Sequence, residues 1–171
     1  MKAMLLAAGR GERLRPLTDR VPKALVQVLG KPLIAWHLER LAAAGFREAV
    51  VNVSHLGEKI VASLGDGARF GLSLRYSREP EPLETAGGIA TALPLLDAAP
   101  FLLVNADIFC EFDFARLRGF DLGGNLAHLV LVPNPAHRAA GDFALQDGKV
   151  LGKAAGAPRY TYAGLAVVSP S

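Results

Sequence analysis

The sequence has almost no cysteine and no long hydrophobic run. Cys110 is its only cysteine in 171 residues, which excludes an internal disulfide and a cysteine-based metal site. Uninterrupted apolar runs reach only the length of a strand, which is too short to span a membrane. The first run, residues 3–8, ends in a Gly/Arg segment and is too short for a signal peptide, so we expect a cytoplasmic protein.

The composition is that of a folded globular chain. Hydrophobic residues make up 51% and charged residues 20% of the sequence, and mean hydropathy is +0.27. These values exclude a disordered or collagen-like chain. The length fits one domain with a buried core, so we expect residues 1–171 to form a single domain.

Positive charge is concentrated near the N-terminus. The chain carries a net charge of +3, but residues 1–31 contain seven basic and two acidic residues, a net +5. Glycines in the same segment indicate a compact anion such as phosphate as the ligand. Because no basic stripe with interleaved aromatic residues accompanies this charge, we expect no nucleic-acid partner, and no membrane partner.

Short apolar runs recur every 20–30 residues with helical patterns between them, which is the spacing of βαβ units. Predicted strands lie at 4–8, 49–53, 72–76, 101–105 and 128–132, and predicted helices at 32–45, 54–64, 86–96 and 114–117. Segments 143–146 and 149–151 flank Asp147-Gly148, which favours a type I′ hairpin, and 160–168 is a further strand. The predicted fold class is α/β: a Rossmann-like, mostly parallel sheet flanked by helices on both faces, with a small antiparallel β appendage.

The first predicted strand runs into a glycine-rich, basic segment. Gly9 and Gly11 allow backbone N–H groups to approach phosphate oxygens, and Arg13 and Lys23 can supply charge. Leu14 stands where the dinucleotide-binding fingerprint requires a third glycine, and the P-loop Gly-Lys-Ser/Thr is absent. Taken alone, the two glycines also fit a tight turn, and Lys23 a solvated loop lysine.

A carboxylate follows another predicted strand. Asp107 lies two residues after the end of the run 101–105, so it should emerge at the carboxyl end of a parallel strand, where open α/β sheets bind ligands. A carboxylate there can hold Mg²⁺ together with substrate phosphates. The alternative is that Asp107 only caps a turn or helix, a role that we assign to Asp113.

The complete N-terminal string is far more specific than its glycines. Gly-x-Gly-x-Arg-Leu-x-Pro-Leu-Thr at 9–18, followed by Pro22-Lys23, closely resembles the signature of sugar-phosphate nucleotidyltransferases. Glu12 and the string Glu-Thr-Ala-Gly-Gly-Ile at 84–89 are most similar to the N-acetylmuramate α-1-phosphate uridylyltransferases of cell-wall recycling. The resemblance implies a nucleotide-diphospho-sugar transferase-like fold. It also implies that UTP and a sugar 1-phosphate, N-acetylmuramic acid 1-phosphate, react to give a UDP-sugar and pyrophosphate, with Mg²⁺ as the cofactor.

The resemblance assigns roles to particular residues. Arg13 and Lys23 are the implied catalytic residues, and Asp107 is the implied metal ligand. The implied nucleotide-binding residues are Leu6, Ala7, Ala8, Gly9, Gly11, Arg13, Lys23, Glu84, Thr85, Gly87 and Gly88, and the implied sugar-binding residues are Asn105, Gly141 and Gly164. Glu84 and Thr85 also fit a plain helix start, as a first-turn acid and a cap.

The sequence departs from the family pattern in two places. Ala106 replaces a usual glycine before Asp107, and a second metal-ligating aspartate, which the family supplies from a downstream segment, does not occur in these residues. We therefore expect the 171-residue chain to bind nucleotide but to turn over poorly. A mannose-1-phosphate guanylyltransferase and a non-catalytic nucleotide- or sugar-phosphate-binding module are the alternatives. An oxidoreductase is disfavoured by Leu14 and by the lack of an acid after the second strand, where Asn52 and Ser54 stand.

Overall fold

The computed structural model describes residues 1–151 and 156–170. Residues 152–155 and 171 of the expected single domain lie outside the described residues. Within the described ranges, no helix is long and apolar enough to cross a membrane.

The core of the fold is an eight-stranded mixed sheet. Its strands follow the order β5-β4-β1-β6-β10-β8-β9, and β7 pairs with β10. The bounds are β1 Ala3–Leu6, β4 Glu48–Val53, β5 Ser73–Arg78, β6 Phe101–Asn105, β7 Ala127–Val132, β8 Phe143–Gln146, β9 Lys149–Leu151 and β10 Arg159–Val168. The strands β5, β4, β1 and β6 are parallel, whereas β10 is antiparallel to β6, β7 and β8. The predicted mostly parallel, Rossmann-like sheet with an antiparallel part is confirmed.

The register of the parallel strands aligns their carboxyl ends. Leu6, the last residue of β1, lies opposite Asn52 of β4 and Asn105 of β6. The loops that follow these strands therefore leave the sheet at the same edge. In open α/β sheets this edge is where ligands bind.

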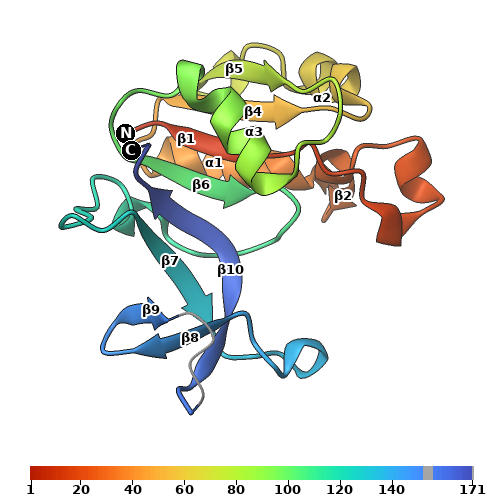
Figure 1. Ribbon diagram of the computed structural model, residues 1–171. Coiled ribbons are helices and arrows are strands. Elements are labelled where there is room, and N and C mark those ends of the chain that lie inside the picture. Colours follow the sequence, from red (N-terminus) through yellow and green to blue (C-terminus); the bar gives the residue numbers. More distant parts are fainter. Residues whose placement is uncertain (152–155, 171) are drawn as a thin grey trace.

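Helices cover both faces of the parallel strands, as predicted (Figure 1). One core cluster joins α1 (Leu33–Ala43) and α2 (Gly57–Leu64) to one face, and the other joins α3 (Glu84–Ala92) to the opposite face. Neighbouring residues of β1 point to opposite clusters, Met4 to the α3 side and Leu5 to the α1 side. Because both faces are buried, the strands read in the sequence as continuous apolar runs.

The helix ends differ from the sequence prediction in places. Pro32 precedes α1 and Gly45 follows it at φ +86°. The helix boundaries predicted from these two residues are therefore correct to within about two residues. In contrast, α2 begins at Gly57 instead of residue 54, after Leu56 at φ +54°. The predicted helix at 114–117 is a single 3₁₀ turn, Phe114–Arg116, because Asp113 caps it and the chain turns away after three residues. The short hairpin of β2 (Gln27–Val28) and β3 (Lys31–Pro32) was not predicted.

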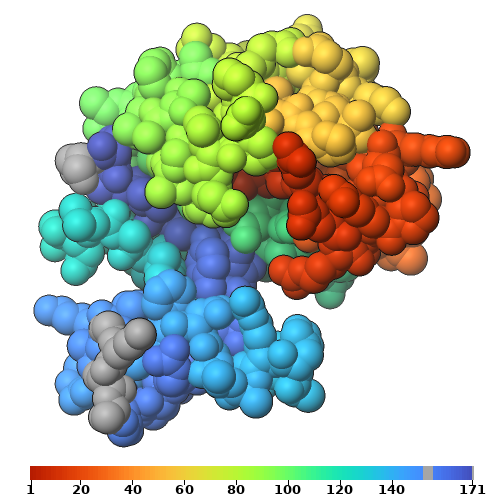
Figure 2. Space-filling model, turned by 45° about the vertical axis from the view of Figure 1, so that its right-hand side comes forward, coloured from red at the N-terminus to blue at the C-terminus, as the bar shows by residue number. Residues whose placement is uncertain are grey.

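The antiparallel part forms a lobe beside the parallel sheet. Strand β10 begins among β7, β8 and β9 and ends paired with β6, so it links the two parts (Figure 1). In Figure 2 this lobe, in blue, stands below the red N-terminal loop. The hairpin between β8 and β9 turns at Asp147 and Gly148, with φ of +50° and +73°, the positive values that a type I′ turn needs.

Leu102 tests the central packing of the sheet. It is the second residue of β6 and is fully buried, so replacing it with Ala should lower the free energy of unfolding by about 2–5 kcal/mol, measured by urea denaturation. The same substitution at Leu126, which is 71% exposed, should change it by less than about 0.5 kcal/mol. Equal losses in both variants would contradict this placement of the core.

Candidate functional site

A cavity of about 610 Å³ opens at the carboxyl ends of β1, β4, β5 and β6. This is the size of a small-molecule site. Its walls come from the loop after β1, the segment around Lys23, the segment before and at the start of α3, and the residues after β6. The lining residues are Leu6, Ala7, Ala8, Gly9, Arg10, Gly11, Glu12, Lys23, Ala24, Asn52, Glu79, Glu81, Pro82, Leu83, Glu84, Thr85, Asn105 and Asp107.

Most of the residues predicted from the sequence meet in this cavity. Ten of them line it: Leu6, Ala7, Ala8, Gly9, Gly11, Lys23, Glu84, Thr85, Asn105 and Asp107. Five of them do not: Arg13, Gly87, Gly88, Gly141 and Gly164. Arg13 is exposed on the 3₁₀ turn Glu12–Leu14, whereas Arg10, three residues earlier, is among the lining residues.

Gly9 and Gly11, the two glycines of the loop after β1, have different structural roles. Gly11 has φ +66°, and a Cβ added to it would lie 2.9 Å from Cγ2 of Thr18 and 3.1 Å from Cβ of Lys23. The hydroxyl of Thr18, a buried residue, donates to the carbonyl of Gly11 at 2.9 Å. Gly11 is thus required by the fold of the loop. A Cβ on Gly9 would meet no atom within 4 Å, so Gly9 leaves space in the cavity wall for a ligand.

Lys23 and Asp107 form an ion pair across the cavity. The Nζ atom of Lys23 donates to Oδ2 of Asp107, although the two residues lie 84 positions apart. Their side chains are 31% and 38% exposed, so both can also be reached by a ligand. A cation that can contact phosphate and a carboxylate that can contact a metal are therefore neighbours.

The chemistry of Asp107 fits a magnesium ion. Within the described residues, no three His, Cys, Asp or Glu side chains gather into a metal-binding group. Mg²⁺ does not need such a group, because it keeps several waters and binds through one or two carboxylates plus substrate phosphates. Asp113, the predicted cap, accepts a hydrogen bond from the backbone N–H of Ala115 at 3.0 Å.

A buried polar pair, Asn52 and Glu79, connects two walls of the cavity. The backbone N–H of Ala7 donates to Oδ1 of Asn52 at 2.7 Å, and Nδ2 of Asn52 donates to Oε1 of Glu79 at 2.7 Å. The other carboxylate oxygen accepts the N–H of Leu83 at 3.1 Å. This chain of bonds ties the loop after β1 to the loop before α3. The pair was not predicted from the sequence, although an asparagine inside the apolar run 49–53 was a signal for it.

Gly87 and Gly88 lie behind the cavity wall and pack closely. A Cβ on Gly88 would lie 2.7 Å from Nδ2 of Asn52 and 2.8 Å from Oε1 of Glu79, and one on Gly87 would lie 2.7 Å from Cβ of Leu83. Gly88 therefore makes room for the buried pair. Glu84, the first residue of α3, lies in the wall itself with φ +58°, a conformation that is costly for a residue other than glycine.

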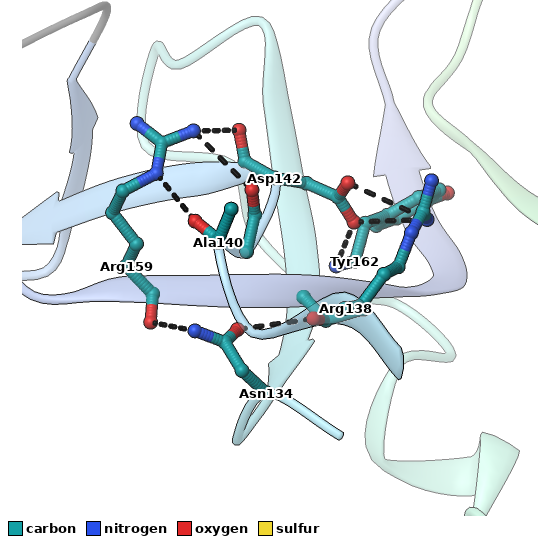
Figure 3. Close-up of polar contacts among 8 residues, drawn as sticks. Asn134, Arg138, Ala140, Asp142, Arg159 and Tyr162 are labelled. Carbon is teal, nitrogen blue, oxygen red and sulfur yellow. Dashed lines mark hydrogen bonds and ion pairs between the residues drawn. The ribbon is translucent and has the colours of Figure 1, made fainter. Parts of the chain in front are cut away.

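The other two predicted glycines belong to β10 and to the lobe. Gly164 has φ +77°, and a Cβ there would lie 3.1 Å from Cβ of Asn105, so this glycine lets β10 lie close to the cavity edge. Gly141 lies in the loop 133–142. Figure 3 shows how this loop is fixed: the guanidinium of Arg159 donates to the carbonyls of Ala140 at 2.8 Å and Asp142 at 3.0 Å. The carboxylate of Asp142 in turn accepts the N–H of Tyr162 at 2.9 Å.

Gly88→Ala tests the buried pair. The added methyl group must push Asn52 from Glu79, so we expect the free energy of unfolding to fall by about 1–3 kcal/mol, despite the higher helix propensity of Ala. The matched control is Gly9→Ala, which has open space and should stay within about 0.5 kcal/mol of the wild type. If Gly88→Ala unfolds at the wild-type urea midpoint, the close packing described here is wrong.

Comparison with known proteins places this geometry in a family. The nucleotidyl transferase family profile matches residues 2–138. The chain is 51% identical to N-acetylmuramate alpha-1-phosphate uridylyltransferase of Neisseria meningitidis serogroup B, over 99% of this chain and 76% of that protein. It is 42% identical to mannose-1-phosphate guanyltransferase of Eremothecium gossypii over 123 residues, 70% of this chain and 34% of the relative.

Solved structures share the fold. HddC from Yersinia pseudotuberculosis, complexed with GMP-PN, superimposes with a TM-score of 0.79 at 23% identity, over 98% of this chain and 76% of that one. The N-terminal motif, the parallel sheet with its cavity and the extent of these matches agree. The chain belongs to the nucleotidyl transferase family.

Proposed function

We propose that the protein joins a sugar 1-phosphate to UTP, giving a UDP-sugar and pyrophosphate, and that the sugar is N-acetylmuramic acid. The observation that carries the proposal is the cavity itself, in which the Gly9–Gly11 loop, Lys23 and Asp107 surround one space. The 51% identity to a uridylyltransferase named for this sugar supports the choice of substrates.

The reaction needs no nucleophilic side chain. The phosphate of a sugar 1-phosphate has a second pKa near 6, so it carries an anionic oxygen at pH 7. That oxygen attacks the α-phosphorus of UTP, a new P–O bond forms, and the bond from the α-phosphorus to the bridging oxygen breaks in line. The electron pair of the broken bond leaves with pyrophosphate. The protein must mainly align two anions and stabilise the developing charge.

We assign the alignment to the first loop and to Lys23. Backbone N–H groups around Gly9 approach the triphosphate, because this glycine leaves the wall open. The Lys23 ammonium contacts phosphate oxygens, and Arg10 in the wall adds positive charge. Arg13, which the family motif implies as a catalytic residue, is exposed beside this wall and would act on the diphosphate from its outer side.

Asp107 is the proposed magnesium ligand. Bound Mg²⁺ would neutralise phosphate charge and polarise the reacting phosphoryl group. In the ligand-free chain the carboxylate is paired with Lys23, so each charge is held in place by the other. With substrates bound, the Lys23 ammonium would contact phosphate and the Asp107 carboxylate would hold the cation, so the ion pair would open. Without substrates, the pair keeps both charged groups at the cavity wall.

The remaining walls are assigned to the base and the sugar. Glu84 and Thr85 line the cavity and would face the nucleobase, supported from behind by Gly87 and Gly88. Asn105 faces the sugar 1-phosphate, at the edge where Gly164 brings β10 close. Gly141, in the lobe, would approach the sugar from the other side. Because UTP is a cytoplasmic metabolite, we place the reaction in the cytoplasm.

Substitution of the ion pair tests the active-site assignment. Lys23→Ala and Asp107→Asn should each lower the rate of pyrophosphate release by at least about 100-fold, because each removes a charge that acts on phosphate or metal. Lys149→Ala, a change on the exposed strand β9 of the lobe, is the control and should keep the wild-type rate. Wild-type rates in both site variants would remove the assignment.

A substrate panel tests the proposed reaction. UTP, GTP and dTTP are each combined with the 1-phosphates of N-acetylmuramic acid, glucose and mannose, and pyrophosphate release and calorimetric nucleotide binding are measured together. We expect the highest kcat/KM for UTP with N-acetylmuramic acid 1-phosphate. Preference for GTP with mannose 1-phosphate would instead support a guanylyltransferase, which the similarity to the Eremothecium relative favours. Slow but measurable turnover of the preferred pair is the result expected from the missing second aspartate, whereas tight UTP binding without turnover of any pair would indicate a nucleotide-binding module.

A further inference from the structure

The segment that carries Asp107 has little regular structure of its own. Between the end of β6 at Asn105 and the 3₁₀ turn that starts at Phe114, the chain forms neither helix nor strand. Its backbone bonds to the sheet are few: Ala106 N–H donates to the carbonyl of Leu6 at 3.1 Å, and Ile108 N–H lies 3.5 Å from the carbonyl of Asn105. Besides the ion pair with Lys23, further contacts must therefore fix the position of Asp107.

Helix α1 supplies the missing contacts. Nε2 of His37 lies 2.8 Å from the carbonyl oxygen of Ile108, the residue after Asp107. One turn later on the same helix face, the guanidinium of Arg40 donates to the carbonyl of Cys110. The ring of Phe109, between these two carbonyls, packs edge-to-face on Trp36 at 5.7 Å. One helix face therefore holds three consecutive residues that follow Asp107.

The tautomer of His37 shows which ring nitrogen makes the contact with the segment after Asp107. Because a carbonyl oxygen can only accept, Nε2 carries the hydrogen and donates it, and Nδ1 carries the lone pair. Nδ1 is buried with no hydrogen-bond partner, and the whole residue is only 1% exposed. Burial lowers the pKa of His37, which keeps the ring neutral at pH 7. An apolar side chain would avoid the cost of the unpaired Nδ1, so the bond to Ile108 is what the histidine contributes here.

We propose that His37 and Arg40 are positioning residues for the metal site: through the carbonyls of Ile108 and Cys110 they set the carboxylate of Asp107 opposite Lys23. The inference rests on the proposed function, because it assigns a metal to Asp107. A carboxylate that binds Mg²⁺ must be held in a fixed position. Removing the contacts that support such a ligand commonly lowers metal affinity by about 10-fold or more. Neither His37 nor Arg40 is among the residues that line the cavity.

The test measures metal-dependent binding, which a change in folding alone would not imitate. UTP is titrated calorimetrically into the full chain in Mg²⁺ and in EDTA. The dissociation constant in EDTA divided by that in Mg²⁺ is the ratio that reports how much the metal contributes to UTP binding. His37→Leu has a similar volume but no donor, so it should lower this ratio by about 10-fold, toward the value of Asp107→Asn. His37→Gln can still donate from Nε2 and should restore the ratio to within about twofold of the wild type.

A second position protects the test against misfolding of a buried variant. Arg40 is partly exposed, and Arg40→Gln should also lower the ratio, whereas Arg40→Lys should retain part of it. Arg47→Gln is the matched control, because the guanidinium of Arg47, like that of Arg40, donates to backbone carbonyls, but to those of Ala42 and Phe46 at the far end of α1. It should keep the wild-type ratio.

The outcomes separate this inference from the proposed function. If the wild type shows metal-dependent UTP binding that Asp107→Asn abolishes, while His37→Leu and Arg40→Gln keep the full ratio, the positioning role is wrong and the proposed function stands. The same holds if Arg47→Gln lowers the ratio as much as they do. If the wild-type ratio is one, the metal assignment of Asp107 fails, and the inference fails with it.

Discussion

The hydrogen-bond ladder between β1 and its two parallel neighbours is the constraint on which the site depends. It places Leu6, Asn52 and Asn105 level with one another at one edge of the sheet. The loop after β1, the buried pair of Asn52 and Glu79, and the segment with Asp107 all start from that edge. A shift of one residue in any of these strands would turn its side chains to the other face and separate the groups that line the cavity.

Charge in the site is organised by contacts between distant segments. Some of the positive charge of the first 31 residues, which carry a net +5, is paired in the structure. Lys23 forms an ion pair with Asp107, and Arg15 lies near Glu12 and Asp19. The cavity wall then contains both signs. This suits the proposed reaction, in which two polyanionic substrates need cations near their phosphates and a carboxylate near the proposed magnesium ion.

Much of the fold followed from local patterns. Buried parallel strands read as apolar runs, Pro32 and Gly45 bounded α1, and Asp147-Gly148 marked the hairpin turn. The predictions that failed concern short elements: the start of α2 follows Leu56 in a left-handed conformation, and 114–117 forms only a 3₁₀ turn. Local sequence preferences at such places are weak, and tertiary contacts decide them.

The sequence by itself determined the family motif, the order of strands and helices, and ten of the residues that line the cavity. These depend on spacing along the chain, which local physics and motif chemistry can read. Only the tertiary structure decided that Lys23 pairs with Asp107, that Gly88 makes room for Asn52 and Glu79, and that α1 holds the segment after Asp107. Each is a contact between segments far apart in the sequence, so it exists only when the register of the sheet brings them together.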